Sequence, residues 1–216
     1  MKAFNFKYLI LIAIATIAIS CQTEISNQSD IKTASESDSI EKIIYSTFIN
    51  KALATETKKD ESITMDYTRI FEWKEYKQIV IHDSTWCSKR KYNYLVKELK
   101  TLSRDTYSDF ERKNKKSEKV NKVAINAEIF YISKSYENKL FDKESLEHQW
   151  DNFYIQFANA QGISSLSKVG FNKHRDQALM YVDYQSHNLD GRGIYILYKK
   201  LNDQWLIESI TTVWIS

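Results

Sequence analysis

The chain has 216 residues, 43% of them hydrophobic, with 31 lysines and arginines against 28 aspartates and glutamates. Residues 1–20 contain two of those lysines, so the remainder carries 29 basic and 28 acidic side chains. This near-neutral net charge gives no argument for a nucleic-acid partner or for binding to anionic lipid. With no proline and four glycines, Pro/Gly-rich linkers are excluded, and the composition fits one globular domain with a sizeable core.

Residues 1–20 have the pattern of a secretory signal peptide. Lys2 and Lys7 form a basic start, and the uncharged apolar run 8–19 follows. That run is shorter than the roughly 20 residues that a permanent membrane-spanning helix needs. We therefore expect residues 1–20 to be removed and the rest of the chain to be exported.

The segment Ala18-Ile19-Ser20-Cys21 resembles the bacterial lipobox, whose cysteine is acylated and becomes the mature N-terminus. The resemblance implies a bacterial lipoprotein with palmitate or related chains on Cys21, held at the periplasmic face or the cell surface, with the membrane as its partner. Ala18 departs from the leucine that the family prefers. Ala18-Ile19-Ser20 also suits ordinary signal peptidase, which would release a soluble chain.

Residues 21–37 are polar and rich in serine and threonine, which predicts a flexible tether before a single domain over 38–216. Asp38 and Glu41 have the spacing of a capping box at a helix start. Behind them an apolar stripe at helical spacing is formed by Ile40, Ile43, Ile44 and Phe48.

The middle of the chain alternates predicted strands and helices. Residues 75–82 and 127–133 have the β-branched and aromatic centres typical of strands. A helix is predicted from about Cys87 into the 100s, with aligned Leu95, Leu99 and Leu102, and a short one from Thr106 to Phe110. Asp142 is the expected N-cap of another helix, which presents an aromatic wall to a sheet through Leu146, Trp150, Phe153 and Phe157.

Four strand-like runs make up the last third of the chain: 163–171, 177–185, 193–200 and 204–215. Short polar turns join them, and connections this short favour an antiparallel meander over parallel βαβ units. The predicted fold class is α+β, with N-terminal helices packed on a C-terminal antiparallel sheet.

Three motifs of the last third resemble a set of uncharacterised secreted bacterial proteins. These are S-x-V-G-F-N at 167–172, A-L-x-Y-V within 177–182, and G-x-G-x-Y from Gly191 to Tyr195. The resemblance covers about half of the chain and implies a similar C-terminal meander. It implies no activity.

Cys21 and Cys87 are the two cysteines of the chain. If Cys21 carries lipid, Cys87 has no disulfide partner within the chain, and we expect its thiol to be buried. The alternatives are a nucleophilic thiol and an exposed or intermolecularly paired one.

The stretch from His82 to Cys87, with Asp83 and Ser84 between them, suggests a hydrolase. Strand geometry argues against it, because His82 and Asp83 point to opposite faces, and no serine lies in a G-x-S-x-G elbow. We expect a strand end followed by a helix cap. An extracytoplasmic hydrolase that uses His82 or Cys87 is the alternative function.

Metal binding is a second alternative, in which Asp183, His187, Asp190 and His174 gather at one end of the sheet. The run 187–193 also has the residues that a hairpin loop needs, and no metal motif is present. We predict neither a metal nor a cofactor. The basic tract 112–122 suits a solvated loop, with lipid headgroups or nucleic acid as alternative contacts.

Aromatic side chains in the meander give the candidate binding surface, which consists of Tyr181, Tyr184, Tyr195 and Tyr198. They occupy both faces of the predicted sheet, and an uncovered aromatic face often marks a binding site. Core packing on both faces is the alternative. We expect a lipid-anchored binding or interaction domain without catalysis, whose ligand the sequence does not identify.

Overall fold

The computed structural model describes residues 36–51, 78–87, 89–123, 125, 127–141, 150–187 and 190–216. The chain divides into two compact units, Met1–Ile40 and Glu41–Ser216, and residues 36–40 of the first are helical. Residues 1–20, Cys21 and the predicted tether up to residue 35 lie outside the described residues. Among the helices that are described, none is long and apolar enough to cross a membrane.

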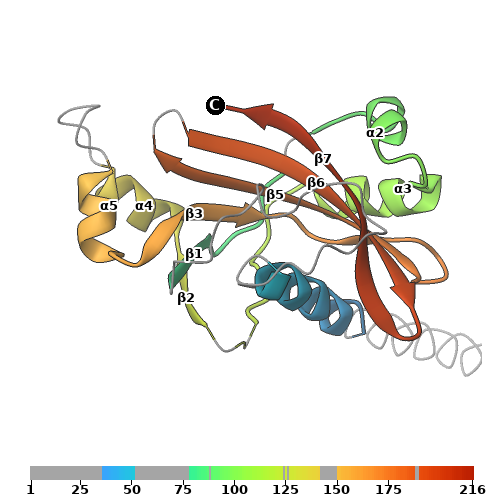
Figure 1. Ribbon diagram of the computed structural model, residues 1–216, viewed down its shortest axis with the longest axis horizontal. Coiled ribbons are helices and arrows are strands. Elements are labelled where there is room, and N and C mark those ends of the chain that lie inside the picture. The colour runs from blue at the N-terminus through green and yellow to red at the C-terminus, as the bar shows by residue number, and fades with distance from the viewer. Residues whose placement is uncertain are drawn as a thin grey trace, which may run out of the picture. The chain divides into compact units, whose positions relative to one another are not determined.

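A seven-stranded sheet forms the centre of the second unit (Figure 1). The strands follow the order β2-β1-β3-β5-β6-β7, and β4 pairs with β5 beside this path. Their bounds are β1 Gln78–His82, β2 Glu128–Ile132, β3 Ala160–Leu166, β4 Gly170–Phe171, β5 Gln177–His187, β6 Asp190–Leu201 and β7 Gln204–Ile215.

Four labelled helices accompany the sheet: α2 Tyr92–Glu98, α3 Arg104–Lys113, α4 Lys134–Leu140 and α5 Asp151–Gln156. The Ser103 side chain caps α3 by accepting from the Thr106 N–H, and Ser133 caps α4 in the same way. The sequence predicted α2, α3 and α5 but not α4. Residues 36–51 are helical, so Asp38 lies inside a helix and the predicted capping box is wrong.

The meander predicted for the last third is confirmed. Strands β3, β5, β6 and β7 are joined antiparallel, and β5 and β6 pair along almost their whole length. The β6–β7 turn uses Asn202 and Asp203, with φ of 47° and 62°. These two residue types tolerate the left-handed conformation better than most, so the turn forms without glycine.

The other half of the sheet is parallel, which the predicted antiparallel sheet did not include. Strand β1 pairs parallel with both β2 and β3, so the sheet is mixed. Parallel neighbours need a long crossover, and the chain between β1 and β2 contains α2 and α3. Helices and a seven-stranded sheet together still place the fold in the α+β class.

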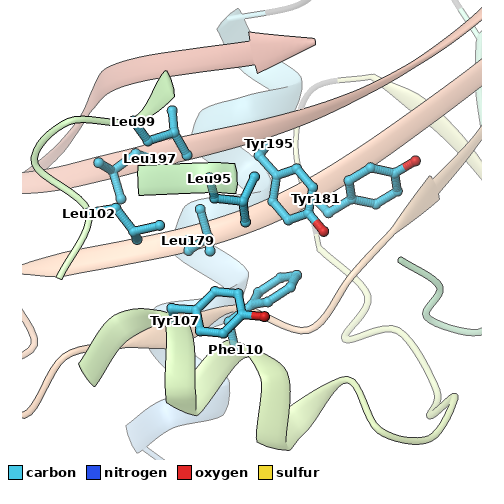
Figure 2. Packing of buried hydrophobic residues seen from close by; sticks show 9 residues of the cluster. All are labelled: Leu95, Leu99, Leu102, Tyr107, Phe110, Leu179, Tyr181, Tyr195 and Leu197. Carbon is cyan, nitrogen blue, oxygen red and sulfur yellow. The ribbon is translucent and has the colours of Figure 1, made fainter. Parts of the chain in front are cut away.

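Side chains from the α2–α3 region and the antiparallel strands form one hydrophobic cluster, drawn in Figure 2. This Leu95 cluster consists of Leu95, Leu99, Leu102, Tyr107, Phe110, Leu179, Tyr181, Tyr195 and Leu197. Close approach of α3 to β4 depends on Gly170, because a Cβ there would lie 2.4 Å from the Phe110 Cα. The cluster includes all three leucines of the stripe predicted for the first helix in this region.

A second cluster gathers around the aromatic side chains of α5. This Phe153 cluster consists of Val80, Ile132, Leu140, Trp150, Phe153, Phe157, Ala160 and Ile163. Its strand residues come from β1, β2 and β3, so the predicted aromatic wall packs on the parallel half of the sheet as well as on the first strand of the meander. Asp142 and Leu146 lie outside the described residues.

Residues 41–51 contribute a third apolar surface, with Ile44, Tyr45, Phe48 and Ile49 all buried. The Tyr45 hydroxyl lies 2.7 Å from the Ser167 carbonyl oxygen and also contacts the Glu41 carboxylate. Glu41 is 2% exposed and lies 3.6 Å from the Lys168 Nζ. The buried Glu41 carboxylate therefore has the Lys168 ammonium as its charged partner. This role differs from the capping of a helix N-terminus that the sequence predicted.

Candidate functional site

Strand register brings several side chains into one line across the sheet. Ser165 on β3 is opposite Asp183 on β5, Asp183 is opposite Gly193 on β6, and Gly193 is opposite Trp214 on β7. Register partners in neighbouring strands direct their side chains to the same face. These four positions therefore share one face of the sheet.

His82 extends this line onto β1. Ile81 is opposite Ser164 on β3, so His82, one residue further along both parallel strands, is level with Ser165. We call the resulting line of five residues the polar row: His82, Ser165, Asp183, Gly193 and Trp214.

The polar row lies between the two hydrophobic clusters on the same face. Tyr181, two residues before Asp183, belongs to the Leu95 cluster, and Ile163, two residues before Ser165, belongs to the Phe153 cluster. Side chains two residues apart on a strand point to the same face. Figure 1 shows α4 and α5 near one end of the sheet and α2 and α3 near the other. The row crosses the sheet between apolar neighbours.

His82 is paired with a carboxylate from α4. Its Nε2 lies 3.7 Å from Glu137 Oε1, and the two side chains are 14% and 17% exposed. Burial lowers the pKa of His82, against the opposing effect of the Glu137 charge, while Lys134 lowers it further. At neutral pH the imidazole is therefore uncharged and can accept or donate a hydrogen bond.

Asp183 is a carboxyl group in the middle of an apolar strand. Its Oδ1 accepts a hydrogen bond of 3.1 Å from the Ser165 backbone N–H. Burial raises the pKa of Asp183 to about 6, opposed by the Ser165 hydrogen bonds and reinforced slightly by the negative charge of Glu137. A carboxyl group with this pKa changes protonation state close to neutral pH.

Cys87 lies near the row and is half-buried, so the expectation of a buried thiol is only partly met. Burial raises the pKa of Cys87 to about 11, the Asp183 charge raises it further, and Lys89 opposes the shift. The thiol is protonated at neutral pH, whereas a nucleophilic cysteine needs the thiolate.

Two tryptophans contact Tyr181, Trp86 from outside the row and Trp214 from within it. Trp86 is 51% exposed, with its ring centroid 5.6 Å from that of Tyr181. The Trp214 Nε1–H donates to the Tyr181 hydroxyl at 2.7 Å. Gly193 makes room for this contact, because a Cβ there would lie 2.0 Å from Trp214 Nε1 and 2.3 Å from the Tyr181 oxygen. The exposed Trp86 indole thus packs against Tyr181, which is two residues before Asp183 on β5.

The predicted aromatic surface is buried. Tyr181, Tyr195 and Tyr198 are 0% exposed and Tyr184 is 3% exposed, so these four residues do not form an open aromatic face. Tyr181 and Tyr195 lie in the Leu95 cluster, and their rings are 5.0 Å apart (Figure 2). Large phenol rings on both faces of a covered sheet are core residues. The row beside Tyr181 takes their place as the candidate site.

The remaining residues of the hydrolase alternative, Asp83 and Ser84, have partners away from His82. The Asp83 carboxylate is paired with Lys119, and Ser84 forms a backbone bridge with the same lysine. Across the described ranges, no serine, threonine or cysteine side chain is hydrogen-bonded to the His82 imidazole. The charges that act on Cys87 are those of Lys89 and Asp183. The structure brings His82 and Cys87 to one region without pairing them.

Among the residues considered as metal ligands, His187 and Asp190 are opposite each other in the β5–β6 register, but their side chains have other partners. His187 stacks on Trp150 and Tyr154, at centroid distances of 5.8 and 5.3 Å, and the Asp190 carboxylate accepts from Ser186. His174 lies in the turn before β5, well apart in sequence. Within the part of the chain that the structure describes, no three His, Cys, Asp or Glu side chains are placed to hold a metal ion.

Sequence reasoning missed the row because its members come from strands far apart in the chain. Trp86, Glu137 and Ser165 had no motif around them. The available signal was Asp183, a single charged residue inside the apolar run of β5, which was grouped instead with His187 and Asp190. No family model matches the chain, and comparisons with curated proteins and with solved structures give no match either.

Proposed function

We propose that the chain is an exported, lipid-anchored binding domain without catalysis, and that its ligand lies over the polar row. Acyl chains on Cys21 hold it at the membrane, as the lipobox-like segment from Ala18 to Cys21 suggests. In this proposal the helices of the N-terminal half cover the C-terminal sheet and leave the row accessible between them. The resemblance to secreted bacterial proteins supports the export.

The observation that carries the proposal is the polar row itself. His82 and Asp183 stand between two apolar clusters, and burial has shifted the pKa of each toward its uncharged form. Apolar side chains at these positions would cost less free energy, because burying titratable groups is unfavourable. Titratable groups kept with perturbed pKa values on a partly exposed face are the usual sign of a functional site.

The chemistry of the row favours a neutral ligand rich in hydroxyl groups, such as a sugar. Asp183 and His82 can each accept or donate hydrogen bonds, depending on protonation. The exposed ring of Trp86 offers a flat apolar surface on which a sugar ring or similar face can stack. Glu137 and ionised Asp183 would repel an anion.

The hydrolase that uses His82 or Cys87 is the alternative, and two features weigh against it. The Cys87 thiol, with a pKa of about 11, is a weak nucleophile at neutral pH. His82 Nε2 lies 3.7 Å from Glu137 Oε1, and no described serine, threonine or cysteine side chain is hydrogen-bonded to the His82 imidazole. A base without a nucleophile or an oriented water does not make an active site.

A thermal-shift screen against a panel of mono- and oligosaccharides tests the ligand site. A ligand at 100 times its Kd stabilises the fold by about 2.7 kcal/mol, which such a melt detects. The shift should disappear in Asp183→Asn and in Trp86→Ala. It should persist in two control variants, Asp203→Asn on the exposed β6–β7 turn and Tyr136→Ala on α4. A ligand whose shift survives both row variants would place the site elsewhere.

Intact mass of the mature protein tests the anchor separately. The proposal expects a chain that starts at Cys21 with added acyl mass, and Cys21→Ser should abolish that addition. A mature chain that starts at Cys21 without acyl mass would contradict the lipid anchor and leave the ligand site unaffected.

A further inference from the structure

Basic side chains are concentrated in one stretch of the chain. Residues 89–116 contain ten lysines and arginines against four aspartates and glutamates. The rest of residues 21–216 then carries 19 basic against 24 acidic side chains. A near-neutral chain is therefore polarised, and a local excess of this size produces a strong positive potential over the α2–α3 region.

The helix α2 shows how this charge is presented. Leu95 and Leu99, four residues apart, are fully buried in the Leu95 cluster. Tyr94, Lys97 and Glu98 are exposed on the rest of the helix surface, and Lys91, the N-cap residue, is exposed at its start. The helix thus separates a buried leucine side from an exposed surface on which the lysines at positions 91, 97 and 100 outnumber the one acidic residue, Glu98.

Three further observations define this exposed surface. Lys100, which follows the helix, is also exposed. Arg90 lies over the ring of Tyr94, with 5.7 Å from its Cζ to the ring centroid, and donates to the Val213 carbonyl at 2.9 Å. Lys91, Lys97 and Lys100 form no ion pair with any described residue. We call Arg90, Lys91, Tyr94, Lys97 and Lys100 the basic surface.

We propose that the basic surface docks on the anionic phospholipid headgroups of the membrane that holds the chain. This inference rests on the proposed lipid anchor at Cys21. Clustered lysines and arginines are attracted to anionic headgroups, and a tyrosine beside them suits the membrane–water interface. An exported chain meets this surface constantly, which favours lipid over nucleic acid as the occupant.

The length of chain before the described residues supports this occupant. Fourteen residues lie between Cys21 and residue 36, and such a segment spans at most about 50 Å when fully extended. A domain on so short a connection stays close to the bilayer, so a weak electrostatic contact gains from a high effective concentration. The anchor and the basic surface would together fix which side of the domain faces the lipid.

Vesicle co-sedimentation tests the surface without the anchor. The protein used is the mature chain, residues 21–216, with Cys21→Ser. It retains every residue of the Leu95 and Phe153 clusters, which lie within residues 80–197. We expect binding to vesicles with about 30% phosphatidylglycerol and none to pure phosphatidylcholine. Raising the salt to about 1 M, where the Debye length falls to about 3 Å, should abolish binding.

Matched charge variants locate the contact. Each lysine lost near an anionic surface should weaken binding about fivefold, so Lys91→Gln, Lys97→Gln and Lys100→Gln together should cost up to about 100-fold. The control removes the same net charge elsewhere, with Lys42→Gln, Lys139→Gln and Lys199→Gln. All six lysines are exposed, so neither triple variant should disturb the fold.

Three results would overturn the proposal: equal losses in the two triple variants, equal binding to both kinds of vesicle, or tighter binding to an oligonucleotide than to anionic vesicles at the same salt. The intact-mass measurement reports on the anchor alone. An acylated protein whose unacylated form ignores anionic vesicles would keep the anchor and refute the docking surface.

Discussion

The Leu95 cluster and the polar row occupy the same face of one sheet, and they differ in every physical respect. No side chain of the cluster is more than 8% exposed, and all are apolar or phenolic. On β5, two residues after Tyr181 of the cluster, Asp183 is partly exposed with a pKa of about 6. The clusters are what stabilise the fold. The row lowers the stability of the fold, because titratable groups are buried there, and our proposal of a ligand site rests on that contrast.

The largest expected effect lies in the clusters. Phe153 is 0% exposed and touches Phe141, Trp150 and Phe157, so Phe153→Ala should destabilise by about 3–5 kcal/mol. Ile155 on the same helix is 80% exposed, and Ile155→Ala should stay within about 0.5 kcal/mol. Urea denaturation measures both. Similar losses in the two variants would show that α5 does not bury the side that the structure assigns to it.

Removing the titratable group of the row should raise the free energy of unfolding, whereas truncating a cluster side chain lowers it. Folding raises the pKa of Asp183 from 3.8 to about 6, so the folded state resists ionisation. Stability therefore falls as pH rises from about 4 to 6, and the loss is complete above that range. Asp183→Asn keeps an oxygen acceptor for the Ser165 N–H and should stabilise by up to about 3 kcal/mol at pH 8.

At pH 4 the same substitution should change stability by less than about 1 kcal/mol, because the folded-state carboxyl is then protonated and the unfolded-state carboxyl is only partly ionised. Thermal melts of wild type and Asp183→Asn across pH 4–8 provide the measurement. A variant that is less stable than wild type at pH 8 would show that the carboxylate is a stabilising partner, and that the row carries no functional cost.

An intermediate effect is expected where the row meets the cluster. A Cβ at Gly193 would overlap Trp214 Nε1 and the Tyr181 oxygen. Gly193→Ala should therefore cost about 1–3 kcal/mol, the usual range for overpacking, and should break the indole–phenol hydrogen bond. Tryptophan fluorescence, together with denaturation, reports both changes. A Gly193→Ala protein with unchanged emission and stability would contradict the packing described around Tyr181.

The smallest effect concerns Cys87. A half-buried thiol with a pKa of about 11 should react with a thiol reagent far more slowly in the native protein than after denaturation. Cys87→Ala should change stability by about 1 kcal/mol or less. Labelling rates at pH 7 give the answer. Native-state labelling as fast as that of the unfolded chain would revive the nucleophilic alternative.

Local signals explain which parts of the fold could be predicted. The meander followed from short polar turns, and α2 from the spacing of Leu95 and Leu99, since both patterns lie within a few residues. Helix α4 was missed because its seven residues carry a single buried apolar side chain, Leu140. Such a helix has no stripe to detect.

Non-local pairing explains the rest. Nothing in the sequence near β1 says that it pairs with β2 and β3 in parallel, because the partners lie some 50 and 80 residues away. The row shares this origin, since register alone brings His82, Ser165 and Asp183 together. The alternation of side chains along a strand correctly placed Tyr181 and Tyr184 on opposite faces of the sheet. Only the structure shows that both faces are covered.

The carboxyl titration of Asp183, followed by the carbon chemical shift of the labelled side chain, tests the central claim most directly. A polar row held between apolar clusters predicts a midpoint near pH 6, about two units above an ordinary aspartate. It also predicts that a ligand of the row shifts this midpoint. A midpoint near 4, unchanged by any ligand that stabilises the protein, would show that Asp183 is an ordinary solvated carboxylate and that the row is not the site.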